Sequence, residues 1–491
     1  MKFKFLFIFI FFLFFAFFND LVVPFPALHW NVQVTFIFSI ITFCIFFIKY
    51  YKQFIIDIKK LLIWKNSSFR IYIYLISYIL FQTIIFGILG KINVVSSLLD
   101  IIAQYFIVFM LCYLTTFFII KRIFKISYVI KIMYSTIFII LIFGILDFFA
   151  YNFNIGFLQT IVHLPNNTST LVAGNDFFNK SIANNFYRVQ SIYFEPGYFA
   201  EHLFILLPLI YGISNSKFKI YKNKLLNKII KKIFVPLTWI NIVLTQSPMW
   251  LCLSLLLTFI MFYKKIIYFL LNYYKHTIVS LIIILVLLLE SINIDVENSY
   301  LSRILKVTNN ITNINSLIIE EPSLGTRLSC IFNLIDIGMS SPVFGIGHSN
   351  IKPQMIKQIQ NNNSKIQVTR EMYYCILVKE SPSFQNPILV NFFVRYGVIA
   401  LILFLFFIFK LRKNLSILSK NASSIVIVFS KSLSMCLLCI LIVGCYDIAI
   451  SDYVCHFIIG CCLGLEQYLH FDQNNIFNKA RLIDENGRQN L

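Results

Sequence analysis

The chain has 491 residues, of which 59% are hydrophobic, 17% aromatic and only 13% charged. Soluble globular domains carry roughly 25% charged residues, so this composition excludes an ordinary soluble protein. Lys and Arg exceed Asp and Glu by 42 to 21, and the resulting net charge of +21 suggests nucleic acid as a partner unless the basic residues follow membrane topology.

Apolar runs of nearly transmembrane length recur along the whole chain. A helix needs about 20 mostly apolar residues to cross the hydrocarbon core. We count twelve candidate spans, at 5–18, 33–48, 71–89, 98–120, 127–150, 191–213, 233–245, 248–263, 276–293, 388–409, 424–445 and 447–465. The chain is therefore predicted to be an all-α polytopic membrane protein.

Two of these runs allow alternatives. The run 5–18 follows Lys2 and Lys4 like the core of a signal peptide, but Asn19-Asp20 replaces a small-residue cleavage site, so we predict an uncleaved anchor. The short run 233–245 adjoins the next across Gln246-Ser247-Pro248, and this pair is either two spans or a re-entrant hairpin.

The basic residues orient these spans. Positively charged residues near the membrane stay in the cytoplasm, whereas long loops cross largely regardless of charge. With the N-terminus inside, the inner segments carry 30 of the 42 Lys and Arg residues. Nearly all the others fall in or beside two long outer loops, 151–190 and 294–387. Both termini are thus predicted to be cytoplasmic, and the charge excess is explained without nucleic acid.

This topology divides the chain into four parts. A bundle of nine spans covers 1–293, a large external loop with an amphipathic helix covers 294–387, three spans cover 388–467, and a cytoplasmic tail covers 468–491. Most of the eleven cysteines lie in spans, where they act as small apolar residues. Cys330 and Cys375 share the outer loop, and the sequence leaves open whether they pair.

The first cluster of candidate functional residues surrounds the start of the sixth span. Proline suits the first turn of a helix, so the regular helix is predicted to begin at Pro196, with Glu195 near its cap and Arg188 in the entering segment. A helix N-terminus beside an arginine suits a phosphate group. The alternative is a structural ion pair between Arg188 and Glu195. Glu201 and His202 follow on different faces of the helix, where a hydrogen-bonded interior histidine is the simpler interpretation.

The second cluster lies in the large outer loop. Leu328, Ile331, Phe332 and Ile335 have helical spacing, which predicts an amphipathic helix that begins near Arg327 and ends at Gly338. Residues 341–350 follow as Ser-Pro-Val-Phe-Gly-Ile-Gly-His-Ser-Asn. Two glycines this close together are also explained by a tight turn.

The third cluster is Ser381-Pro382-Ser383-Phe384-Gln385-Asn386-Pro387, which leads into the tenth span with Asn391 and Arg395-Tyr396-Gly397-Val398. Polar residues and proline before an apolar run are, in the simpler interpretation, ordinary loop punctuation.

In this order, the three clusters resemble the O-antigen polymerase and O-antigen ligase family of bacterial membrane glycosyltransferases. The matching features are Arg188 before Phe194-Glu195-Pro196, Thr326-Arg327 before residues 342–347, and Asn386 before Asn391 and Tyr396-Gly397-Val398-Ile399. The hydropathy profile also agrees, with about a dozen spans and one large external loop late in the chain.

The resemblance implies a reaction without a metal or other cofactor on the outer face of the cytoplasmic membrane. The donor would be a glycan on undecaprenyl diphosphate, with a chain-length regulator and a flippase as partners in the same membrane. Arg188 and Arg327 would stabilise the leaving diphosphate, and Glu195 would orient an arginine or accept a proton. The candidate substrate-binding residues are Tyr193, Tyr198, His348, Asn386 and Arg303.

Two departures from the family pattern bear on the activity. Ser247-Pro248-Met249 stands where members often have Ser-Arg. Ser383-Phe384-Gln385-Asn386 lacks the histidine typical of the ligases, which favours a polymerase unless His348 takes that role. A flippase or other transporter for lipid-linked oligosaccharides is the alternative outside the enzymes, and its expected signature is charge buried across several spans.

Overall fold

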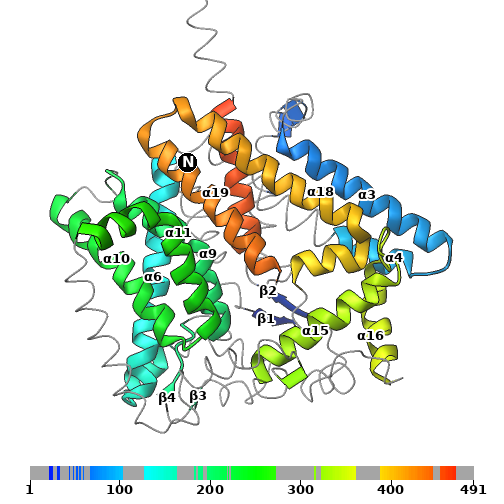
Figure 1. Cartoon of the computed structure of the whole chain (residues 1–491), viewed down its shortest axis with the longest axis horizontal. Helices are drawn as coiled ribbons and strands as arrows, with labels where there is room; N and C mark the ends of the chain where they lie inside the picture. Colours follow the sequence, from blue (N-terminus) through cyan, green and yellow to red (C-terminus); the bar gives the residue numbers. More distant parts are fainter. Residues whose placement is uncertain are drawn as a thin grey trace, which may run out of the picture.

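The computed structural model describes residues 22–25, 30–33, 67–102, 126–162, 182–183, 186–191, 196–217, 219, 223–272, 315–316, 322–360, 387–445 and 454–470, together with scattered helical positions between 44 and 59. In these residues the protein is helical apart from two small antiparallel hairpins (Figure 1). One hairpin pairs β1 (Val22–Phe25) with β2 (Trp30–Gln33), and the other pairs β3 (Ile182–Ala183) with β4 (Phe186–Tyr187).

Five helices of the described part are long and apolar enough to cross a membrane. They are α3 (Ser68–Ile88), α6 (Ile126–Asn152), α9 (Pro196–Asn215), α18 (Ile388–Leu418) and α19 (Ser424–Gly444). Each coincides with a predicted span, so a multi-pass membrane protein is supported. The runs 5–18, 33–48, 98–120, 276–293 and 447–465 lie wholly or partly outside the described residues.

The seventh and eighth apolar runs form helices longer than the runs themselves. These helices are α10 (Lys224–Leu244) and α11 (Pro248–Asn272), joined by a turn at 245–247. At 1.5 Å per residue they are about 31 and 37 Å long. Neither is among the five helices that are long and apolar enough over the described residues to cross a membrane, so both alternatives remain open. The extra length comes from lysine-bearing turns, which do not appear in a count of apolar residues.

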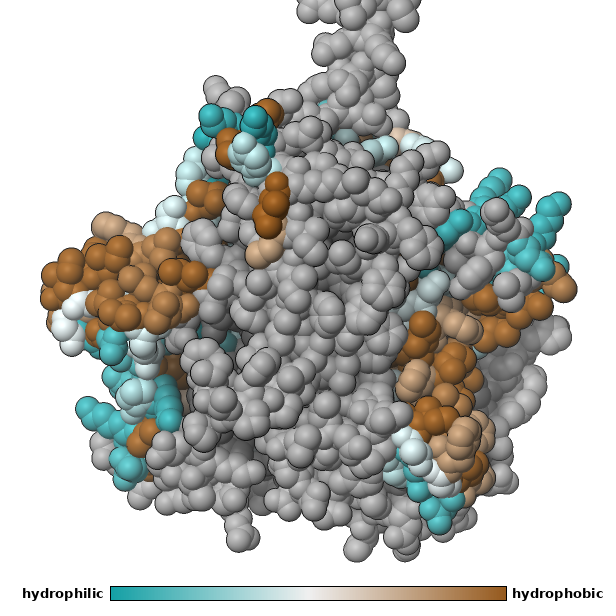
Figure 2. Space-filling view, turned by 180° about the vertical axis from the view of Figure 1, so that it is seen from behind, coloured by the Kyte–Doolittle hydropathy of each residue, from teal (hydrophilic) through white to brown (hydrophobic). Residues whose placement is uncertain are grey.

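The bundle is centred on α9. This helix packs against α10, α11 and α19, while α18 packs against α3 and α19. Nearly all side chains of α9 are buried, including Glu201 and His202. The outward faces of α3, α10, α11 and α18 carry exposed Ile, Leu, Phe and Val, visible as brown surface on both flanks in Figure 2. Apolar side chains facing outward are what a lipid environment requires.

A buried polar cluster joins three helices at one end of the bundle. The carboxylate of Glu466, in the helical segment 454–470, accepts hydrogen bonds from the Ser68 backbone N–H (3.2 Å), the Ser68 hydroxyl (3.0 Å) and the Asn414 amide. Ser68 begins α3, so the carboxylate satisfies a free N–H at a helix N-terminus, where negative charge is favourable.

The two ends of the bundle differ in structure. The α9–α10 linker and η7 (Ser419–Asn421) lie at the upper end in Figure 1. At the opposite end lie β3, β4 and three further helices, α4 (Val94–Ile101), α15 (Pro322–Met339) and α16 (Ile351–Gln360), with η5 (His348–Asn350) before α16. A second, smaller apolar core joins α15 and α16 to Val390 and Val394 of α18. The residues from the predicted outer loop therefore pack directly on the bundle.

Candidate functional site

Helix α18 is broken within its apolar run. Gly397 has φ 80° and ψ −177°, a conformation essentially restricted to glycine, and it divides α18 into two helical pieces. Breaking a helix frees backbone groups that must find other partners in an apolar setting. A break of this kind is retained where something else in the fold supplies those partners.

The segment 342–347 supplies most of them. Ile346 N–H donates to Val394 O (2.8 Å) and Gly347 N–H to Arg395 O (3.0 Å), while Val398 N–H donates to Pro342 O (2.8 Å). The fit is close, because a Cβ on Gly345 would meet the Arg395 carbonyl, and one on Gly397 would overlap Val343 O. Gly345 also has a positive φ of 69°. Two of the three sequence clusters thus meet in one backbone junction.

Helix α3 completes the junction from a third direction. The Gln82 side-chain amide donates to Arg395 O (3.0 Å) and to Phe344 O, and the Tyr78 hydroxyl donates to Tyr396 O (3.0 Å). With these bonds, the exposed carbonyls of residues 394 to 396 each have a donor. The break is thereby held in one geometry rather than left to flex.

Three side chains that could bind a ligand or take part in a reaction lie together at this junction. His348 is only 5% exposed, and its Nδ1 lies 2.6 Å from the Tyr396 hydroxyl. A guanidinium nitrogen of Arg395 lies 3.4 and 3.5 Å from the two ring nitrogens of His348. The buried Nε of Arg395 has no acceptor within the described residues. A half-buried arginine with a neutral neighbour and an unused donor is suited to binding an anion.

Burial and the Arg395 charge together lower the pKa of His348 to about 3. The ring is therefore neutral at physiological pH, since its unperturbed pKa is about 6.5. In the folded protein the ring stays unprotonated between pH 6.5 and 3, whereas the unfolded chain takes up a proton there. Stability is consequently lost as the pH falls below 6.5.

We expect acidification from pH 7.5 to 5.0 to cost the wild type about 2 kcal/mol through this histidine alone. His348→Asn, which keeps a hydrogen-bonding group near the Nδ1 position, should lose that share of the pH dependence. Urea unfolding in detergent at both pH values measures the difference. Parallel pH profiles for the two proteins would mean that His348 takes up its proton in the folded state.

The first cluster lies elsewhere at the same end and is held by backbone contacts. The helix begins at Pro196, as predicted. Arg188 Nε donates to Thr245 O (3.1 Å), just past the C-terminus of α10, where a cation is favoured. The Asp147 carboxylate of α6 accepts the Gln190 and Ser191 N–H groups (2.9 and 3.0 Å). Arg188 therefore has at least one structural role.

The amphipathic helix exists, but its bounds and buried face differ from the prediction. Helix α15 begins at Pro322, so Arg327 lies inside the helix rather than at its start. Ile331 of the predicted face is buried, together with Cys330, Leu334 and Ile337, while Leu328, Phe332 and Ile335 are only partly covered. The prediction assigned the face from apolar spacing alone, whereas packing on α16 and α18 also buries the polar Asn333.

The structure describes only some of the predicted site residues. Arg327 lies twelve residues before the end of α15, which is about 18 Å along the helix axis from its C-terminal end. Tyr198 is half-buried in the first turn of α9. The remaining candidates lie outside the described residues, namely Glu195, Tyr193, Asn386 and Arg303, as does Cys375. Cys330 is buried, and this burial raises the pKa of its thiol to about 12.

Arg395, Tyr78 and Gln82 are candidate functional-site residues that were not predicted from the sequence. Two signals were present in the sequence: Arg395 is an ionisable residue inside an apolar run, and Gly397 interrupts the same run. Ionisable groups in such runs are usually functional or paired. No sequence signal connects the Tyr78 and Gln82 side chains to a backbone break more than 300 residues away.

No known protein-family model matches the chain, and no curated protein matches it at a significant level.

Proposed function

We propose that the protein is a membrane glycosyltransferase that polymerises a surface polysaccharide such as an O-antigen or a capsule-like glycan. Its substrates would be oligosaccharide repeats linked to undecaprenyl diphosphate, joined on the outer face of the cytoplasmic membrane. The observation that carries the proposal is the junction at the broken helix α18. It joins two of the three motif clusters and places Arg395 beside a neutral His348, with an Nε that has no acceptor among the described residues.

The chemistry requires stabilisation of a leaving diphosphate. An acceptor sugar hydroxyl attacks the anomeric carbon of the donor, a new C–O bond forms, and the bond between that carbon and the diphosphate oxygen breaks. The hydroxyl proton passes to a base, for which Glu195 is the candidate, and the lipid diphosphate leaves with the bonding electrons. Arginine donors that hold these oxygens in a water-poor site lower the barrier.

The proposal keeps the predicted topology of twelve spans with both termini in the cytoplasm. Arg188, the α15 helix and the junction all lie at one end of the bundle, opposite the α9–α10 linker (Figure 1). In this topology that end faces outward, where lipid-linked repeats and acceptors are exposed. Arg188 and Arg327 retain the roles implied by the family resemblance, with Arg395 as an additional anion-binding group.

Two alternatives each gain an observation. His348, buried against Tyr396 and Arg395, would serve a ligase that transfers the glycan to a lipid acceptor. A flippase or transporter is favoured by the ionisable groups buried in separate helices, at Asp147, Glu201 and Glu466. Asp147 and Glu466 already accept backbone N–H groups, which is a structural explanation for two of the three.

Deleting the gene and separating surface glycans on a gel distinguishes these functions. Loss of a polymerase leaves single-repeat products on the surface, loss of a ligase leaves polymer still attached to undecaprenyl diphosphate, and loss of a flippase leaves neither outside. We expect single repeats, restored to long chains by the wild-type gene. Purified protein given lipid-linked repeats should then form polymer without any added partner, and failure of both results would refute the polymerase assignment.

A further inference from the structure

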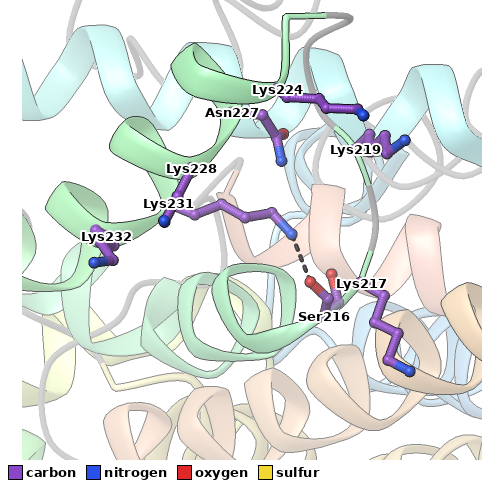
Figure 3. Close-up of a pocket in the computed structure, with 8 residues that line it drawn as sticks. All are labelled: Ser216, Lys217, Lys219, Lys224, Asn227, Lys228, Lys231 and Lys232. Atoms are coloured by element: carbon purple, nitrogen blue, oxygen red, sulfur yellow. Dashed lines mark hydrogen bonds between the residues drawn. The ribbon is translucent and has the colours of Figure 1, made fainter.

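A strongly basic pocket lies at the end of the bundle opposite the junction. It has a volume of about 440 Å³ and is formed where α9 ends and α10 begins. Six lysines line it (Figure 3): Lys217, Lys219, Lys224, Lys228, Lys231 and Lys232. None of the described lining residues is acidic, and the sequence has no Asp or Glu between Glu201 and Glu290.

One lysine side chain connects the two sides of the pocket. Lys231 extends from α10 and donates from Nζ to the Ser216 carbonyl oxygen (2.6 Å), just past the C-terminus of α9. Partial burial lowers the pKa of this lysine. The contact fixes the α9–α10 linker against α10, so the other lysines are presented around a defined hollow rather than along a loose loop.

The lysines occupy one stripe of α10, and an apolar stripe runs beside it. Lys224, Lys228 and Lys231 share a face at helical spacing. Leu225, Ile229 and Ile233 form a neighbouring row, four residues apart, and are exposed, at 66%, 43% and 47%. Figure 2 shows hydrophilic surface above brown surface on the flank that corresponds to α10 and α11. A ligand bound here would contact ammonium groups at one end and the apolar stripe of α10 at the other.

We propose that this pocket binds the phosphate headgroup of an anionic phospholipid, whose acyl chains lie along the apolar stripe of α10. Several ammonium groups with no acidic partner among the described lining residues match a phosphate diester or diphosphate in charge. The adjoining apolar stripe distinguishes a lipid from free phosphate, which has nothing to place there. Basic pockets between helices at a membrane face bind anionic headgroups on the same principle.

The test titrates phosphatidylglycerol into the full-length protein in a neutral detergent at low salt, with phosphatidylcholine as the zwitterionic comparison. Lys224→Gln with Lys228→Gln removes two exposed pocket charges and leaves the Lys231 contact in place. The matched control is Lys413→Gln with Lys420→Gln, which removes two exposed charges at the same end of the bundle but outside the pocket. Binding is read by native mass spectrometry.

We expect the wild type to prefer phosphatidylglycerol and the pocket variant to lose roughly 10- to 30-fold in affinity, while the control pair stays near wild type. Equal weakening in both pairs would reduce the effect to general attraction between a basic surface and anionic lipid and overturn the proposal. The proposal would also be overturned if sodium pyrophosphate bound in the absence of lipid and displaced phosphatidylglycerol. If the pocket variant fails to fold, Lys217→Gln with Lys219→Gln provides the same comparison from the linker.

Discussion

Arg395→Ala should reduce polymerisation of purified lipid-linked repeats by roughly 10² to 10³-fold, and Arg395→Lys should recover only a small part of it. The guanidinium lies against His348 and has a buried Nε without an acceptor among the described residues. Its planar fork can make two parallel bonds to phosphate oxygens, which the point charge of lysine cannot reproduce. The reaction is followed at matched protein amounts by the length of the glycan.

Two further arginines make this result specific. Arg70, which donates to Tyr74 at the other end of the bundle, is the control, and Arg70→Ala should retain nearly full activity. Arg327→Ala and Arg327→Lys are run in parallel, because the family resemblance assigns Arg327 the same task. Full activity in Arg395→Lys would reduce Arg395 to a simple positive charge. Damage at Arg327 alone would favour the family-based site over the junction.

Gly397→Ala should be the most destabilising single substitution at the junction, with a loss of about 3 to 6 kcal/mol. Its backbone conformation costs a residue with a side chain about 1 to 3 kcal/mol. The added Cβ would also overlap Val343 O, which pushes residues 342–347 away and weakens three backbone hydrogen bonds of about 1 kcal/mol each. Thermal unfolding in detergent measures the loss of stability, and the amount of polymer formed measures the loss of activity.

Gly90→Ala separates strain from displacement. Gly90 also has a positive φ, of 67°, but a Cβ there meets no atom within 4 Å. This variant should show only the conformational penalty. The excess loss in Gly397→Ala over Gly90→Ala then contains the contribution of the docked segment, together with any difference between the two backbone penalties. If the two variants unfold alike, the contact between residues 342–347 and α18 does not stabilise the protein.

Much of the architecture follows from residues read along the chain. Long apolar runs predicted the positions of α3, α6, α9, α18 and α19, because a helix that satisfies its own backbone is the simplest structure for such a run in lipid. Pro196 marked the start of α9 because proline suits the first turn. The alternative of a tight turn at Gly345 and Gly347 was also correct in part, since both have positive φ values.

Other features depend on which segments the tertiary structure brings together. Arg188 Nε donates to the Thr245 carbonyl, 57 residues later in the chain, a contact that no local sequence pattern predicted. The buried face of α15 likewise depends on α16 and α18 as well as on its own apolar spacing.

The junction itself shows the physical reason for this division. Apolar spacing, proline and glycine act through the local backbone, so their consequences are legible within a few residues. The carbonyls freed at Gly397 can be satisfied by any donor of suitable geometry, and nothing local to α18 specifies residues 346–347, Tyr78 or Gln82. Only the packed bundle selects those donors, and with them it places His348 against Arg395 and Tyr396.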